Sequence, residues 1–175
     1  MNAAICYLTC PLLLLLSSAT NAATNISVPI PNGYQTVGNG KLSWWGITIY
    51  HATLHSVDGI YHPQRDHALQ INYRINVTAQ KLAEVSLDEI EAIYGPQPQR
   101  KAMVQRLSAV FCDVKKGDSI LGHHQPGKGA TFYCNDHLSG TLDAPELADA
   151  FFAIWLHPDS SEPQLRTQLI GVKSQ

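Results

Sequence analysis

The sequence predicts an α+β domain in which an antiparallel sheet is covered on one face by helices. Apolar and polar residues alternate over residues 69–77, which is the pattern of a half-buried strand. Apolar residues recur at helical spacing between 86 and 110 and again between 145 and 171. Because strand-like and helix-like segments come in blocks rather than in regular βα alternation, the sheet is expected to be antiparallel.

The first part of the chain predicts extended structure. Residues 24–33 hold two prolines and a glycine and are expected to form an extended lead-in. The glycines at 38 and 40 are interpreted as a turn. Residues 44–54 are rich in aromatic and β-branched side chains without helix caps, so they are expected to form one long strand.

Two helices are predicted in the middle of the chain. Ser86 followed by Glu89 has the spacing of a capping box, and Gly95 with the next proline ends the segment. A second helix is expected over 99–110. Both helices are expected to cover the sheet.

The last third predicts a meander and two more helices. Strands are expected up to about residue 125, over 130–134 and over 138–142, with tight turns between them. Helices are expected to begin at Pro145 and near Ser161.

The N-terminus has the pattern of a secretory signal peptide. A mostly apolar run from Leu8 to Leu16 gives way to small residues that end at Ala22 and Ala23. The run is much shorter than the ~20 apolar residues that span a bilayer. We therefore predict a signal peptide over 1–23, one domain over 24–175, a periplasmic or secreted location, and no membrane span after cleavage.

Two cysteines, Cys112 and Cys134, remain after the predicted cleavage. In an oxidising compartment such thiols commonly pair, so a disulfide is favoured, with two separate buried thiols as the alternative.

Composition and motifs argue against several classes of function. The net charge is −2 with acids and bases interspersed, which is unlike a nucleic-acid binder. His51 and His55 would share one face of a strand, whereas His123 and His124 would point to opposite faces. No ligand spacing completes a metal site, and no nucleophile elbow or phosphate-binding loop is present. No metal or cofactor is predicted.

Several segments, in this order and spacing, resemble the bacterial exported branch of the chalcone-isomerase-like proteins. The segments are GNGK at 38–41, WWGITIY at 44–50, ALQINY at 68–73, FCDV at 111–114, GD at 117–118, PGKG at 126–129, FFAIWL at 151–156, and LR with LIG within 165–171. The resemblance implies an open-faced β-sandwich, with a large antiparallel sheet and a helical layer around a cleft for a small, largely apolar ligand. Relatives include plant isomerases that close a chalcone to a flavanone and non-catalytic proteins that bind fatty acids.

The resemblance also implies where a ligand would bind. Lys41 takes the place of an arginine that meets the negative charge of the ligand, and His51 falls at a polar position of the plant enzyme. A polar pair of that enzyme falls near Ile154 and Trp155, which cannot stabilise a developing enolate.

We therefore expect a non-catalytic protein that binds a small amphipathic or carboxylated ligand such as a fatty acid. Its expected site is lined by Lys41, Tyr50, His51, Tyr73 and Trp155. Two alternatives remain open: an isomerase or lyase acting on a small phenolic or enone-type substrate, with His51 as general base, and an interaction subunit without a ligand.

Overall fold

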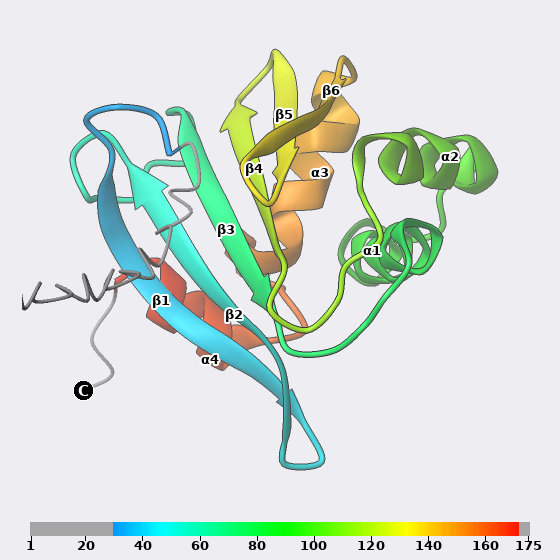
Figure 1. Ribbon diagram of the computed structural model, residues 1–175. Coiled ribbons are helices and arrows are strands. Elements are labelled where there is room, and N and C mark those ends of the chain that lie inside the picture. Colours follow the sequence, from blue (N-terminus) through cyan, green and yellow to red (C-terminus); the bar gives the residue numbers. More distant parts are fainter. Residues whose placement is uncertain (1–29, 172–175) are drawn as a thin grey trace, which may run out of the picture.

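The computed structural model describes residues 30–171, so the predicted signal peptide at 1–23 lies outside the described residues. Six strands and four helices make up this part of the chain (Figure 1). Their bounds are β1 Gln35–Trp44, β2 Ile47–Ser56, β3 His67–Tyr73, α1 Ala79–Tyr94, α2 Arg100–Val110, β4 Ser119–Gln125, β5 Gly129–Cys134, β6 His137–Leu142, α3 Pro145–Leu156 and α4 Pro163–Leu169.

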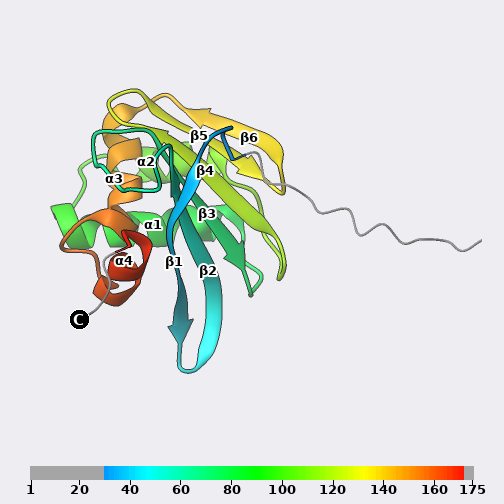
Figure 2. The same cartoon turned by 90° about the vertical axis from the view of Figure 1, so that its left-hand side faces the viewer.

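The six strands form one antiparallel sheet in the order β1-β2-β3-β4-β5-β6. Figure 2 shows the helices gathered on one side of this sheet. The predicted α+β class, with an antiparallel sheet covered on one face, is therefore confirmed. Within residues 30–171, no helix has both the length and the apolar character needed to cross a bilayer.

The two faces of the sheet differ in burial. Along β2, Ala52 and Leu54 are fully buried and pack in the hydrophobic core against the helices. We call this side the core face. The alternate residues of β2, such as His51, point to the opposite side, which we call the open face.

The expected single strand over 44–54 is wrong, because the chain turns within it. Trp44 pairs with Ile47, and Trp45 and Gly46 form the two-residue loop of a hairpin between β1 and β2. Both loop residues have positive φ, 49° and 78°, as the turn that fits the twist of a hairpin requires. Gly46 lies inside the predicted strand and is instead a residue of this turn.

The glycines at 38 and 40 lie in β1 rather than in the predicted turn. Neither has a positive φ, so backbone freedom does not explain them. A Cβ atom at Gly38 would overlap the backbone carbonyl oxygen of Gln168, and one at Gly40 would collide with the Gln168 and Leu165 side chains. These glycines therefore let α4 pack directly on β1.

The N-cap of helix α1 lies eight residues before the predicted capping box. Thr78 is the N-cap, and its hydroxyl accepts a hydrogen bond from the backbone N–H of Lys81. Ser86 lies inside the helix and donates to the carbonyl of Leu82. The predicted capping box at Ser86 and Glu89 is therefore wrong, because Thr78 provides the N-cap of this helix.

Cys112 and Cys134 form a disulfide, as the sequence favoured. The bond joins the chain just after α2 to the end of β5. It ties the α1–α2 layer to the far half of the sheet.

Candidate functional site

A cleft of about 450 Å³ opens where β3 begins and β4 ends. The loop before β3, the end of α1, the β4–β5 turn and the second half of α3 enclose it. Apolar and aromatic walls come from Tyr61, Tyr94, Pro126, Phe152, Ala153, Leu156 and Pro158, and polar groups come from His67, His124, Asp149 and His157. We call this the His124 cleft.

Three polar side chains on its floor lie in a continuous series of contacts at hydrogen-bond distance. His67 and His124 are cross-strand partners on the core face of β3 and β4, and their Nε2 and Nδ1 atoms lie 3.2 Å apart. His67 Nδ1 lies 2.9 Å from the carbonyl oxygen of Arg65, and His124 Nε2 lies 2.8 Å from Oδ1 of Asp149. All four ring nitrogens therefore have a partner.

Aromatic packing fixes the two imidazoles. The His124 ring stacks on Phe152 with centroids 4.4 Å apart and an interplanar angle of 7°. The His67 ring meets the edges of both Phe152 and Tyr61. The His67 residue is 2% exposed and His124 is 4% exposed, so neither ring can rotate without opening the core.

The three contacts of His67 and His124 need one proton more than two neutral imidazoles supply. The Arg65 carbonyl and the Asp149 carboxylate only accept, so each facing nitrogen must carry a proton, and the contact between the rings needs a third. Two neutral imidazoles supply two protons. Filling all three contacts therefore requires one imidazolium inside the protein.

Burial acts against that third proton. Desolvation lowers the pKa of His67 to about 4, although the Arg65 carbonyl partly opposes this. Desolvation also lowers the pKa of His124, with Asp149 opposing. At neutral pH the two histidines therefore hold two protons. We assign the contact without a proton to the one between the two rings, because the hydrogen bond from His124 to the Asp149 carboxylate is stronger.

The cleft has one acidic end and one basic neighbour. Asp149 has a side chain 51% exposed, and its charge adds to the burial that raises the pKa of Tyr94. Burial raises the pKa of Tyr61, while the charge of Arg166 opposes this. Arg166 donates from Nε to the carbonyl of Leu156, a residue of the cleft wall. Both tyrosine hydroxyls are thus protonated donors at neutral pH.

Three of the five predicted ligand residues come together between the sheet and α3. Trp155 donates from Nε1 to the hydroxyl of Tyr50 over 2.9 Å. The rings of Tyr50 and Tyr73 meet edge to face with centroids 6.2 Å apart. Tyr73 and Trp155 are buried, 6% and 8% exposed, so this cluster is part of the core.

The other two predicted residues, Lys41 and His51, lie on the opposite side of the sheet. They are cross-strand partners and both are exposed on the open face. The expectation that one cavity between sheet and helices holds all five residues is therefore wrong. The reason is the period of a strand: Tyr50 and His51 are neighbours and must face opposite ways.

The residues of the His124 cleft were missed from the sequence. The prediction that His123 and His124 point to opposite faces is confirmed, since His123 contacts the hydroxyl of Tyr34 at 3.0 Å while His124 lies in the cleft. One further signal was available: Asp149 interrupts the apolar surface of α3 one turn before Phe152. Among residues 30–171, no group of three or more His, Cys, Asp or Glu side chains is arranged to hold a metal ion.

A six-stranded antiparallel sheet with helices on one face defines an open-faced β-sandwich of the α+β class. Residues 47–171, well over half of the chain, match the family model described as chalcone isomerase-like. The chain therefore belongs to the chalcone isomerase-like family.

One similar sequence and one similar structure illustrate the likeness. An uncharacterized protein of Haemophilus influenzae is 28% identical over 140 residues, which cover 79% of this chain and 68% of that protein. The crystal structure of a fatty-acid binding protein of Arabidopsis thaliana superposes with a TM-score of 0.59 at 11% identity, covering 83% of this chain and 90% of that one. At that identity the second likeness concerns the fold.

Proposed function

We propose that this protein is an exported, non-catalytic member of the family that binds one small amphipathic ligand in the His124 cleft. The observation that carries the proposal is the cleft itself: about 450 Å³ of space with an apolar wall and a few convergent polar groups. This combination is typical of sites for small molecules.

The arrangement of charge favours one orientation of a carboxylated ligand such as a fatty acid. Asp149 repels a carboxylate at its end of the cleft. Tyr61 provides a hydroxyl donor, and the positive charge of Arg166 acts on it. The carboxylate is therefore expected beside Tyr61, with the apolar part against Phe152 and Leu156.

Binding is favoured over catalysis because the two ring nitrogens that lack a proton face each other rather than a substrate. A general base needs a nitrogen within hydrogen-bond reach of the substrate. His67 Nδ1 donates to the Arg65 carbonyl and His124 Nε2 to Asp149, and the remaining two ring nitrogens lie 3.2 Å apart. His51, the base of the alternative isomerase hypothesis, is exposed on the open face.

A periplasmic or secreted location is part of the proposal. The Cys112–Cys134 disulfide supports it, because such bonds persist in oxidising compartments. Cell fractionation with mass measurement of the isolated protein tests it. A mass matching the loss of residues 1–23 is expected, and a cytosolic full-length protein would contradict it.

The ligand hypothesis is tested by calorimetric titration with saturated fatty acids and with alcohols of the same chain length. Acids are expected to bind and alcohols to bind more weakly. Ala153→Phe fills the cleft from its α3 wall and should abolish binding without loss of the fold, which circular dichroism checks. Tyr61→Phe and Arg166→Gln should weaken the acids in particular.

Lys41→Gln is the matched control for charge, because Lys41 lies on the open face. Its affinity should equal that of the unchanged protein. If Lys41→Gln abolished binding while Ala153→Phe retained it, the ligand would sit on the other side of the sheet. Turnover of a chalcone or enone by the unchanged protein would favour the isomerase hypothesis instead.

A further inference from the structure

The loop between β1 and β2 exposes three large apolar side chains. Trp44 is 66% exposed, Trp45 is 90% exposed and Ile47 is 63% exposed. The other tryptophan, Trp155, is buried at 8%. Two adjacent tryptophans in water are costly to leave uncovered, so this hairpin tip needs a physical account.

The tip projects beyond the rest of the sheet. The pairing of β2 with β3 ends at Tyr50 and Tyr73, and a final backbone bond joins Arg74 to Ile49. Beyond that point the two arms of the hairpin pair only with each other. Figures 1 and 2 show the hairpin extending past the sheet in both views, so the tip is a convex finger rather than a groove.

The backbone at the tip is held in a conformation that tryptophan disfavours. Trp45 has a φ of 49°, in the left-handed region that glycine and asparagine adopt most readily. A bulky aromatic is kept at a strained, fully solvated turn position, where it contributes nothing to the core. Strain retained at an exposed position points to a role in contact with another body.

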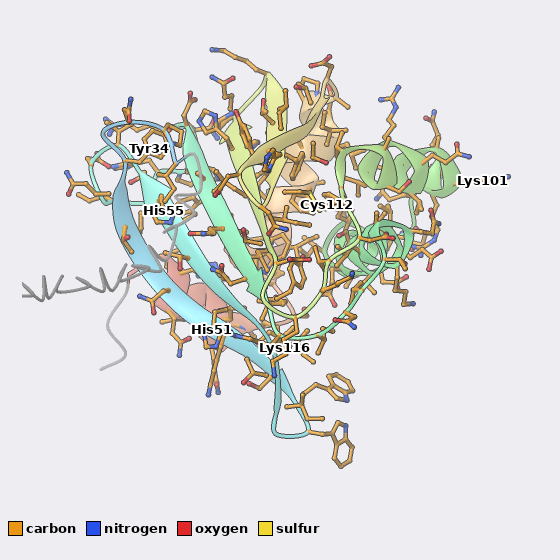
Figure 3. All side chains as sticks on the ribbon, viewed as in Figure 1. Tyr34, His51, His55, Lys101, Cys112 and Lys116 are labelled. Carbon is orange, nitrogen blue, oxygen red and sulfur yellow. A yellow bond between two sulfur atoms is a disulfide. The ribbon has the colours of Figure 1, made fainter. Side chains whose placement is uncertain are left out.

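Positive side chains surround the base of the finger. Lys41 lies on β1 three residues before the tip, and Arg74 follows the last pairing of β3. Lys115 and Lys116 belong to the loop whose Gly117 donates to the carbonyl of Tyr73. Figure 3 shows Lys116 close to where the hairpin leaves the sheet. We call Lys41, Arg74, Lys115 and Lys116 the cationic collar.

The collar is exposed, and its cations outnumber the carboxylates of the loop that carries Lys115 and Lys116. All four side chains are exposed, and none forms an ion pair with another side chain of the described chain. The carboxylates of Asp113 and Asp118 accept from the backbone amides of Ala79 and Lys115 and keep their charge, so four cations stand against two anions. The collar is therefore available to a negatively charged surface.

The spacing of tip and collar fits the layers of a membrane. At about 3.3 Å per residue, Lys41 lies roughly 10 Å behind Trp44 along the strand. A peripheral protein buries its apolar groups ~5–10 Å into the boundary between headgroups and acyl chains. Tryptophans at that boundary would leave the collar among the phosphates.

The size of the patch argues against a protein partner or a second copy. With about 250 Å² for a whole tryptophan side chain, the tip exposes on the order of 500 Å² of apolar surface. A stable protein interface buries ~800 Å² on each partner, usually over a flat or grooved surface. A narrow aromatic finger with cations behind it matches an anionic bilayer better.

We propose that the Trp44–Ile47 tip inserts into the surface of an anionic lipid bilayer and that the cationic collar holds the lipid phosphates. This interaction is independent of any ligand in the His124 cleft. It would place the domain against the membrane with its sheet end-on.

Vesicle binding tests this proposal. The purified protein is mixed with vesicles of phosphatidylcholine alone, or of equal parts phosphatidylcholine and phosphatidylglycerol, and followed by co-sedimentation and tryptophan emission. We expect binding to the anionic vesicles with a shift of the emission to shorter wavelength, and weaker binding in high salt.

Trp45→Asn separates binding from folding. It gives the turn the asparagine–glycine sequence that hairpins of this kind prefer, so thermal stability should be kept or increased. Its affinity for anionic vesicles should fall at least about tenfold. Leu138→Asn is the matched control, because Leu138 is 65% exposed on β6, at the other edge of the sheet.

The collar has its own matched pair. Lys116→Gln should weaken vesicle binding, and Lys101→Gln, on the exposed side of α2, should not. The proposal is overturned if the unchanged protein binds to neither kind of vesicle. It is also overturned if Trp45→Asn binds anionic vesicles as tightly as the unchanged protein. Self-association that Trp45→Asn abolishes, without any vesicle binding, would assign the tip to a second copy and also overturn it.

Discussion

Trp155 and Tyr50 connect the helical layer to the sheet through one hydrogen bond. The indole Nε1 of α3 donates to the hydroxyl of β2 over 2.9 Å, although the residues are 105 positions apart in the chain. Trp155 is only 8% exposed, so its N–H has little access to water as an alternative acceptor.

Tyr50→Phe should therefore destabilise the fold. The substitution keeps the ring and leaves the buried indole N–H without its acceptor, which costs about 1–3 kcal/mol. Urea unfolding measures the loss. Tyr73→Phe is the control, since the described residues give the Tyr73 hydroxyl no hydrogen-bond partner, and its loss should be smaller. Equal losses in the two variants would show that the hydrogen bond contributes little.

Gly38→Ala and Gly40→Ala should differ in cost. A methyl group at Gly38 meets the backbone carbonyl oxygens of Gln168 and Leu169, which cannot move without shifting α4. At Gly40 it meets the flexible side chains of Gln168 and Leu165. We expect the first substitution to cost about 2 kcal/mol or more and the second to cost less. Thermal unfolding of both variants checks the order.

Stability should fall as the pH drops from about 6.5 to about 4. The pKa of His67 is about 6.5 in the unfolded chain and about 4 in the folded one, because burial disfavours the charged ring. The unfolded state binds more protons across this interval, so acid favours unfolding, by up to about 3 kcal/mol for this group. Chemical denaturation at a series of pH values measures the slope.

His67→Phe is expected to flatten this pH dependence, because it removes the titrating group and keeps an aromatic ring against Phe152. An unchanged slope in His67→Phe would mean that the dependence arises elsewhere, for example at His55 or His123, whose pKa values burial also lowers.

Reduction of the Cys112–Cys134 disulfide should destabilise the protein by about 3 kcal/mol, given the sequence separation of 22 residues. Guanidinium unfolding with and without dithiothreitol measures it. The double variant Cys112→Ser with Cys134→Ser should be insensitive to the reductant. If reduction lowered the stability of that variant as well, the effect would have another origin.

The sequence predicted the elements whose pattern is local. The strands after residue 67 alternate in polarity or end in clear turns, which predicted them, and the block order of strands and helices predicted the antiparallel arrangement. Strand β1 was not predicted, because Gly38, Asn39, Gly40 and Lys41 are poor strand formers. They form a strand through their pairing with β2, and Gly38 and Gly40 leave room for α4, which lies more than a hundred residues later.

The cleft was hidden for the same physical reason. His67 and His124 are 57 positions apart, and Asp149 lies 25 positions beyond His124. Only the register of β3 against β4 and the placement of α3 bring them together. The placement of Lys41 and His51, by contrast, could have been anticipated, because alternation along β2 separates His51 from Tyr50.

Helix α4 packs on Gly38 and Gly40, so the first strand of the sheet is covered only when this last helix is in place. Until residues 163–169 dock, the glycine backbone of the first strand has no cover on its inner side. The earliest strand and the last helix must therefore find each other across nearly the whole polypeptide. Contacts between residues so far apart in the sequence slow folding.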